Sequence, residues 1–132
     1  MPNNLIVHEE RAKQLINFGG ILTPPLCLTD MDACFEFHDK GYLFVEVKYK
    51  GKKVPYGQRI FLERITKRLA LSVKAVTIIV DHEVEDPKET INLCECKVRK
   101  VFWGDVEQWE FPKKPCTAGE FINTYQKWLE KL

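Results

Sequence analysis

The chain has 132 residues and a net charge of +1; hydrophobic residues make up 45% of it and charged residues 30%. This balance is typical of a soluble globular protein and excludes an intrinsically disordered chain. No apolar run reaches the roughly 18 residues that span a bilayer, and the first residues lack the basic and apolar regions of a signal peptide. We therefore expect one cytoplasmic domain over residues 1–132, with no membrane contact.

The N-terminal segment, Asn4–Phe18, is predicted to form an amphipathic helix that stops at Gly19–Gly20. Its apolar residues recur at helical spacing: Leu5, Ala12, Leu15 and Ile16. Glu9 falls on the same face as Ala12 and Ile16, so we expect its carboxylate to point inward.

A β-hairpin is predicted next. Residues Asp32–Phe37 alternate between apolar and polar, and a polar turn ending in Gly41 leads into the apolar strand Tyr42–Lys48. A cationic loop then precedes a helix from about Gln58 to Leu71. Gln58 shares the face of Leu62 and is expected to point inward, whereas the basic residues of this helix are left toward solvent.

The second half of the chain supplies the rest of the sheet. The β-branched run Val73–Val80 predicts a central strand buried on both faces, and Ile91–Trp103 and Val106–Phe111 predict a hairpin at the sheet edge. Thr117 and Glu120 match a capping box, which begins a closing amphipathic helix. The order of elements predicts an α/β fold: a single α/β/α layered domain with a mixed central sheet.

The five cysteines, Cys27, Cys34, Cys94, Cys96 and Cys116, are an odd number in a chain without a secretory signal. This argues for reduced thiols rather than a disulfide framework. Cys94 and Cys96 invite a zinc interpretation, but no second Cys/His pair has zinc-site spacing. We expect both to be buried on one face of a strand.

A charged pair interrupts the most apolar strand. Glu46 and Lys48 are two residues apart, so both side chains project from the same face, and Asp32 on the preceding strand can lie beside Glu46. Charges on a central strand need partners, and two neighbouring carboxylates are commonly bridged by a divalent cation. Hard oxygen ligands favour Mg²⁺ or Mn²⁺ over zinc. Such a cation beside a lysine suits hydrolysis of a phosphodiester, because both stabilise developing negative charge.

The spacing of these residues resembles the PD-(D/E)XK nuclease superfamily, which includes Holliday-junction resolvases, RecB-type and lambda-type exonucleases and many restriction enzymes. The resemblance rests on Asp32, on Glu46-Val47-Lys48 after thirteen intervening residues, and on Gln58 at the start of the next helix. It covers about half the chain, roughly from Glu9 to Val80.

The resemblance implies a restriction-endonuclease-like fold and Mg²⁺-dependent or Mn²⁺-dependent cleavage of DNA, with a homodimer favoured if the protein oligomerises. Asp32, Glu46 and Val47 would hold the metal, and Lys48 would assist the attacking water. Gln58 would position water or backbone, and Glu9 would support the metal through solvent. One departure is that Thr29-Asp30 stands where a Pro-Asp pair is expected, so Asp30 competes with Asp32 for the ligand role.

Basic residues near this site are candidates for contacts with DNA phosphates: Lys50, Lys52, Lys53, Arg59, Arg64, Lys67 and Arg68. Such contacts give salt-dependent affinity that is largely independent of sequence. They favour a structure-selective or nonspecific nuclease over a sequence-specific one, and the resemblance implies a role in phage or bacterial recombination or repair.

Two other functions stay open from sequence. The chain could be a catalytically inactive, nuclease-like module that binds DNA or protein. It could also be a subunit of a complex that docks through the edge hairpin, where Trp103, Trp109 and Phe111 lie; a large exposed apolar patch there would favour this function. In the least specific interpretation, Glu46 and Lys48 form an ion pair on an exposed sheet face.

Overall fold

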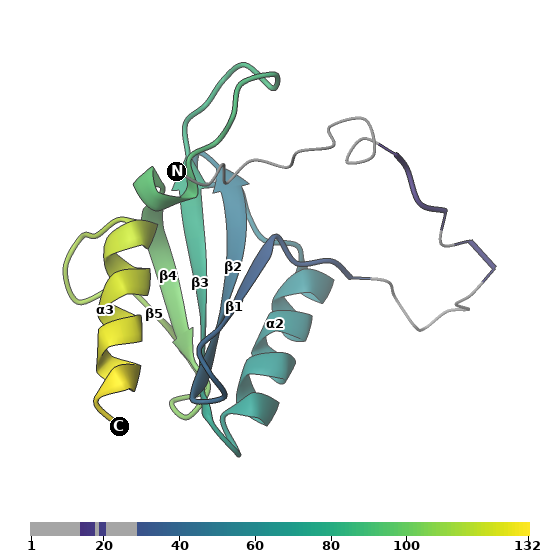
Figure 1. Ribbon diagram of the computed structural model, residues 1–132. Helices are drawn as coiled ribbons and strands as arrows, with labels where there is room; N and C mark the ends of the chain where they lie inside the picture. Colours follow the sequence, from purple (N-terminus) through teal and green to yellow (C-terminus); the bar gives the residue numbers. More distant parts are fainter. Residues whose placement is uncertain (1–13, 18, 21–28) are drawn as a thin grey trace.

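A computed structural model describes residues 14–17, 19–20 and 29–132, which build a five-stranded mixed sheet with two helices (Figure 1). The strands lie in the order β1-β2-β3-β4-β5, and only the β2–β3 pair is parallel. The elements are β1 Ala33–Glu36, β2 Gly41–Tyr49, α2 Tyr56–Leu69, β3 Lys74–His82, β4 Lys97–Trp103, β5 Trp109–Glu110 and α3 Ala118–Glu130. The predicted mixed α/β architecture is confirmed.

The two helices cover opposite faces of the sheet (Figure 1). Successive side chains of a strand point to opposite faces, so Val76 and Ile78 lie on the α3 side together with Leu129, whereas Thr77 lies on the α2 side. β3 is buried from Ala75 to Val80, as the β-branched run predicted. This burial on both faces makes β2 and β3 the centre of the molecule.

The parallel pairing of β2 with β3 requires a crossover, which α2 provides. In this register Glu46 lies beside Ile79 and Lys48 beside Asp81. The predicted hairpin Asp32–Lys48 is also confirmed, since β1 pairs antiparallel with β2. The start of α2 therefore lies near the carboxyl end of β2, at one end of the sheet's strands.

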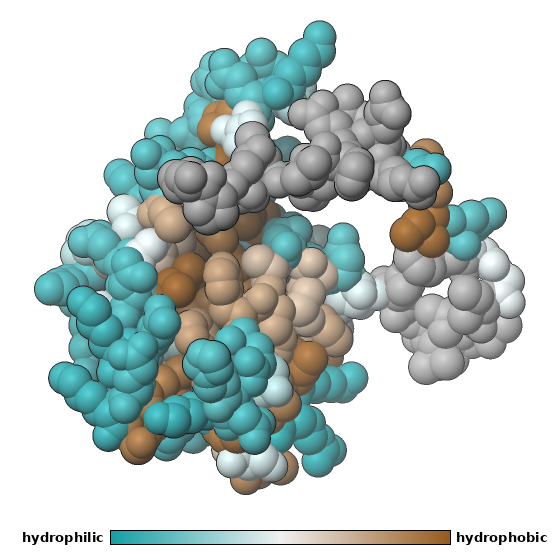
Figure 2. Space-filling view, in the orientation of Figure 1, coloured by the Kyte–Doolittle hydropathy of each residue, from teal (hydrophilic) through white to brown (hydrophobic). Residues whose placement is uncertain are grey.

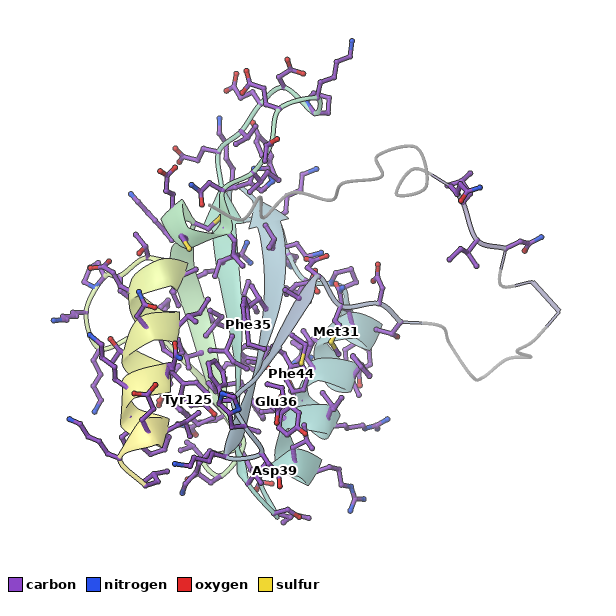
Figure 3. All side chains as sticks on the ribbon, in the orientation of Figure 1. Met31, Phe35, Glu36, Asp39, Phe44 and Tyr125 are labelled. Carbon is purple, nitrogen blue, oxygen red and sulfur yellow. The ribbon has the colours of Figure 1, made fainter. Side chains whose placement is uncertain are left out.

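Figure 3 labels residues from both sides of β1. Phe35 lies toward α3 with Tyr125, and Met31 lies toward α2 with Phe44. On the visible face of the molecule the hydrophobic residues gather centrally and hydrophilic ones surround them (Figure 2). Among the described residues, no helix has the length and apolarity needed to cross a membrane.

The first predicted helix is not borne out where it can be compared. Residues 14–17 carry no helix, and the side chain of Leu15 is 97% exposed, so these residues lack the buried apolar face that stabilises an amphipathic helix. The other residues of the predicted helix, 4–13 and 18, lie outside the described residues, and Glu9 is one of them.

The predicted strand Ile91–Trp103 is too long at its start. Leu93–Glu95 form a 3₁₀ helix, because the Asn92 side chain accepts a hydrogen bond from the Cys94 backbone N–H at 3.1 Å and so competes with strand pairing. Cys94 is consequently exposed and Cys96 buried, which corrects the prediction that both lie buried on one strand face. The four described cysteines form no disulfide with one another.

The edge hairpin is shorter than predicted. Only Trp109–Glu110 of the segment Val106–Phe111 pairs with β4, after a left-handed residue, Glu107, with φ of 62°. The closing helix α3 begins as predicted: Thr117 accepts a hydrogen bond from the Glu120 backbone N–H, and the Glu120 side chain accepts one from the Thr117 N–H.

Candidate functional site

A cleft of about 440 Å³ opens where β2 ends and α2 begins. The carboxyl ends of parallel strands commonly form ligand sites in α/β folds. Three segments line this cleft: the residues before β1, the end of β2 and the first turn of α2. The lining residues are Thr29, Asp30, Asp32, Glu46, Val47, Lys48, Pro55, Gly57 and Gln58. Asp32, Glu46, Val47, Lys48 and Gln58, all predicted from sequence, are thus brought together.

Asp32 is held directly before the first residue of β1. Its Oδ2 accepts a hydrogen bond of 2.7 Å from the Val47 backbone N–H. The register pairs Ala33 with Val45, so Met31 would be the next backbone partner of Val47, and the Asp32 side chain takes that place. In a strand the N–H and C=O of one residue point to the same edge. The Val47 carbonyl therefore faces the same side as Asp32.

Glu46 is the buried acid of the site, with only 2% of its side chain exposed. Its Oε1 lies 3.6 Å from Lys48 Nζ, whereas its Oε2 has no hydrogen-bond partner among the described residues. Burial, followed by the neighbouring Asp32 carboxyl group, raises the pKa of Glu46 to about 8, and Lys48 opposes this rise. A buried oxygen without a partner is rare because it forfeits its hydration.

Lys48 and Gln58 complete the group. The Lys48 ammonium donates a hydrogen bond to Gln58 Oε1 at 3.3 Å, so it lies between the carboxylate of Glu46 and the amide of α2. Gln58 points inward, as the helical spacing predicted. These two partners restrict an otherwise flexible lysine to the floor of the cleft.

These residues fit a divalent cation with oxygen ligands. The unpartnered Glu46 oxygen lies at an open cleft beside a second carboxylate, Asp32, and the Val47 carbonyl is directed to the same edge. Mg²⁺ commonly takes one or two carboxylates and keeps several waters. In the part of the chain that the structure describes, no group of three or more His, Cys, Asp or Glu side chains is placed to hold a metal ion. Asp30 also lines the cleft, so it stays available as a supporting acid.

Two of the seven basic residues predicted to contact DNA form ion pairs with acids. Lys50 pairs with Glu85 at 3.0 Å and Arg59 with Glu63 at 3.1 Å. The others have no ion-pair partner in the part of the chain that the structure describes: Lys52 and Lys53 in the loop after β2, and Arg64, Lys67 and Arg68 on α2. The five basic residues without an ion pair thus lie in the loop and on α2.

The predicted aromatic surface on the edge hairpin is largely absent. Trp103 packs against Phe121 of α3, with ring centroids 5.9 Å apart, and Trp109 packs against Phe102 at 5.1 Å. Only Phe111 is mostly exposed, and Lys100 lies 4.4 Å from its ring centroid. A protein-docking surface formed jointly by these aromatic residues is therefore not supported.

No role was predicted for Asp81 from the sequence. Asp81 lies in β3 beside Lys48 and forms an ion pair with Arg99 from β4. It also accepts a hydrogen bond from the Gly51 backbone N–H at 3.0 Å. The hydrogen bonds from Arg99 hold the pKa of Asp81 below its usual range. Asp81 thereby fixes the loop that follows Lys48, and its position just after the β-branched run was the available signal.

No protein-family model, curated protein or solved structure matches this chain.

Proposed function

We propose that the protein is a Mg²⁺-dependent nuclease of the PD-(D/E)XK type that hydrolyses phosphodiester bonds of DNA. The observation that carries the proposal is the buried Glu46, whose unpartnered oxygen lies in an open cleft together with Asp32 and Lys48. A carboxylate buried in this position is destabilising unless it binds a proton or a ligand completes its contacts.

The chain would divide the chemistry among a few residues. Asp32, Glu46 and the Val47 carbonyl would hold the cation, and bound Mg²⁺ lowers the pKa of a coordinated water and offsets the charge of the phosphate. Lys48 can donate a hydrogen bond to the attacking water or to a phosphate oxygen. Gln58 accepts from Lys48 and so keeps the ammonium directed into the cleft.

The alternative is a nuclease-like module that binds nucleic acid without cutting it. Such a module needs positive charge but has no use for a buried carboxylate with an unpartnered oxygen. The geometry around Glu46 therefore favours an enzyme over a binding module.

Cleavage time courses with Mg²⁺ or Mn²⁺ on linear, circular and four-way-junction DNA test the proposal. Lys48→Ala should lower the cleavage rate by about 100-fold or more, because it removes the cation that stabilises developing charge. The matched control, Lys127→Ala, changes an exposed lysine of α3 and should cut at the wild-type rate. Absence of metal-dependent cutting on all three substrates, with DNA binding intact in Lys48→Ala, would favour the binding module.

A further inference from the structure

A second polar network lies on the flank of α2 that faces β5. Glu63 Oε2 accepts two hydrogen bonds, one from Trp109 Nε1 at 2.7 Å and one from an Arg59 guanidinium N–H at 3.1 Å. Trp109 in turn packs against the buried ring of Phe102. The Glu63 carboxylate thus links Trp109 of the sheet to Arg59 on the surface of α2.

The arginine held in this way lies over an aromatic ring. The Arg59 guanidinium carbon is 5.4 Å from the ring centroid of Tyr56, whose side chain is 72% exposed. Guanidinium groups attract aromatic faces, so Arg59 and Glu63 both restrict how the ring and the charge can move. Tyr56 lies between Pro55 and Gly57, both of which line the cleft. The stacked pair is therefore within one helical turn of the candidate site.

A contribution to stability does not explain this arrangement. Helical Arg–Glu pairs at i,i+4 contribute only about 0.3–0.5 kcal/mol when solvent-exposed, and the Arg59 end of this pair is 42% exposed. Glu63 already serves the indole N–H of Trp109, and that contact needs neither Arg59 nor Tyr56. What the network adds is a held cation beside an exposed aromatic ring whose neighbours in the chain, Pro55 and Gly57, line the cleft.

This combination suits a nucleic-acid strand. An aromatic ring stacks on an unpaired base of any sequence, and a guanidinium contacts phosphate. We propose that Tyr56 and Arg59 bind an unpaired nucleotide next to the phosphate in the cleft, with Glu63 and Trp109 as positioning residues. This inference rests on the proposed nuclease function and refines its substrate class.

The expected substrate is a strand with unpaired bases near the scissile bond. Within a continuous duplex each base is already stacked on both sides and is not available to Tyr56. Single strands, overhangs and branch points offer free bases. The protein is thus expected to bind these forms more tightly than a blunt duplex of the same sequence.

Fluorescence anisotropy of the full chain with a labelled single strand and a matching blunt duplex, in EDTA, tests the stacking. Tyr56→Ala should weaken binding of the single strand by about tenfold and leave the duplex nearly unchanged, because stacking on one base is lost. Tyr56→Phe keeps the ring and should bind like wild type. Equal affinity of the wild type for both forms, or an equal loss for both in Tyr56→Ala, would overturn the inference.

Glu63→Gln should change the affinity for the single strand in opposite directions under two explanations: an effect of net charge, or positioning of Arg59 by Glu63. Removing a negative charge strengthens nucleic-acid binding if only net charge matters. If Glu63 positions Arg59, the variant binds the single strand several-fold more weakly, as Arg59→Gln does. The glutamine oxygen can still accept from Trp109, so the fold has a replacement partner there. Single-strand binding as tight as wild type, or tighter, would contradict the positioning role.

Arg64→Gln is the matched control for Arg59→Gln, because it removes the same charge from an exposed position on the same helix. It should weaken single-strand and duplex binding slightly and to the same extent. If wild type cuts DNA with Mg²⁺ while Tyr56→Ala and Glu63→Gln bind like wild type, only this inference fails. If wild type neither binds nor cuts any nucleic acid, the proposed function fails as well.

Discussion

The two faces of the sheet are built from the same strands but with opposite chemistry. On the α3 side, β2 and β3 contribute only apolar side chains to the core: Leu43, Val45, Val76, Ile78 and Val80. On the α2 side the same strands carry Glu46, Lys48 and Thr77, all buried or half-buried. The α3 side has the composition of a stabilising core, whereas the α2 side keeps polar groups that a core would exclude.

The polar groups on the α2 side differ in whether they have hydrogen-bond partners. The hydroxyl groups of Thr66 and Thr77 lie 2.6 Å apart, and Thr66 also donates to the Leu62 carbonyl. This pair is fully satisfied and closes the contact between α2 and β3. Glu46, at the cleft, keeps an oxygen without a partner. Buried polar groups without a hydrogen-bond partner are rare, so Glu46 differs from the neighbouring threonine pair in a way that the proposed cation site would explain.

The apolar side should give the largest change in stability. Leu129 is 1% exposed and packs in the cluster around β2 and β3, so Leu129→Ala should lower the free energy of unfolding by about 2–5 kcal/mol. Urea denaturation measures the change. Leu132→Ala, at a side chain that is 61% exposed, should stay within about 0.5 kcal/mol of wild type. Similar losses in both variants would contradict a core on the α3 side.

The polar side should respond in the opposite direction. Because the folded state raises the pKa of Glu46 from 4.5 to about 8, it binds a proton that the unfolded chain releases across this interval. The free energy of unfolding therefore falls as the pH rises through it. Glu46→Gln should stabilise the protein near pH 8 by about 1–3 kcal/mol, and near pH 4.5 the gain should shrink.

Urea denaturation in EDTA at both pH values checks this prediction. Glu130→Gln changes an exposed glutamate of α3 and serves as the control. A destabilised Glu46→Gln near pH 8 would mean that the carboxylate is satisfied in the folded protein.

Gln58 tests whether the lysine must be held. Gln58→Ala removes the hydrogen bond that Lys48 donates, so the cleavage rate should fall by about tenfold while the unfolding free energy changes little. Gln126→Ala, on an exposed position of α3, is the matched control and should cut normally. Unchanged cleavage in Gln58→Ala would remove Gln58 from the site.

The helix starts give the smallest effect. α3 has a capping box at Thr117, whereas α2 begins after Pro55 without a side-chain cap. Thr117→Ala should lower the free energy of unfolding by about 1 kcal/mol, and the exposed Thr124→Ala of the same helix should not. Thermal unfolding of the two variants compares them. Equal stability would show that the capping box contributes nothing to α3.

The elements with strong periodicity could be predicted from sequence. The run Val73–Val80, the hairpin before it and the helix after Thr117 combine alternation, β-branched residues or a capping box with consistent turn signals. The segment around Asn92 could not, because a local side-chain hydrogen bond competes with strand pairing there and leaves no signal in the hydrophobic pattern.

The cleft residues were predictable because strand and helix periods place them on shared faces. Glu46 and Lys48 alternate correctly, and Gln58 falls on the inward face of α2. Partnerships between distant segments were not predictable. The Asp81–Arg99 pair depends on the β3–β4 register, and the Glu63–Trp109 bond joins residues 46 positions apart. Neither follows from periodicity, since both depend on how the sheet is ordered.

Thermal unfolding of wild type and Glu46→Gln across a Mg²⁺ titration near pH 8 tests most directly that the unsatisfied carboxylate is a cation site. A ligand that binds only the folded state raises the unfolding temperature with its concentration. Wild type should therefore gain stability with Mg²⁺, and Glu46→Gln should gain little. An equal gain in both proteins, or none in wild type, would contradict a cation site at Glu46.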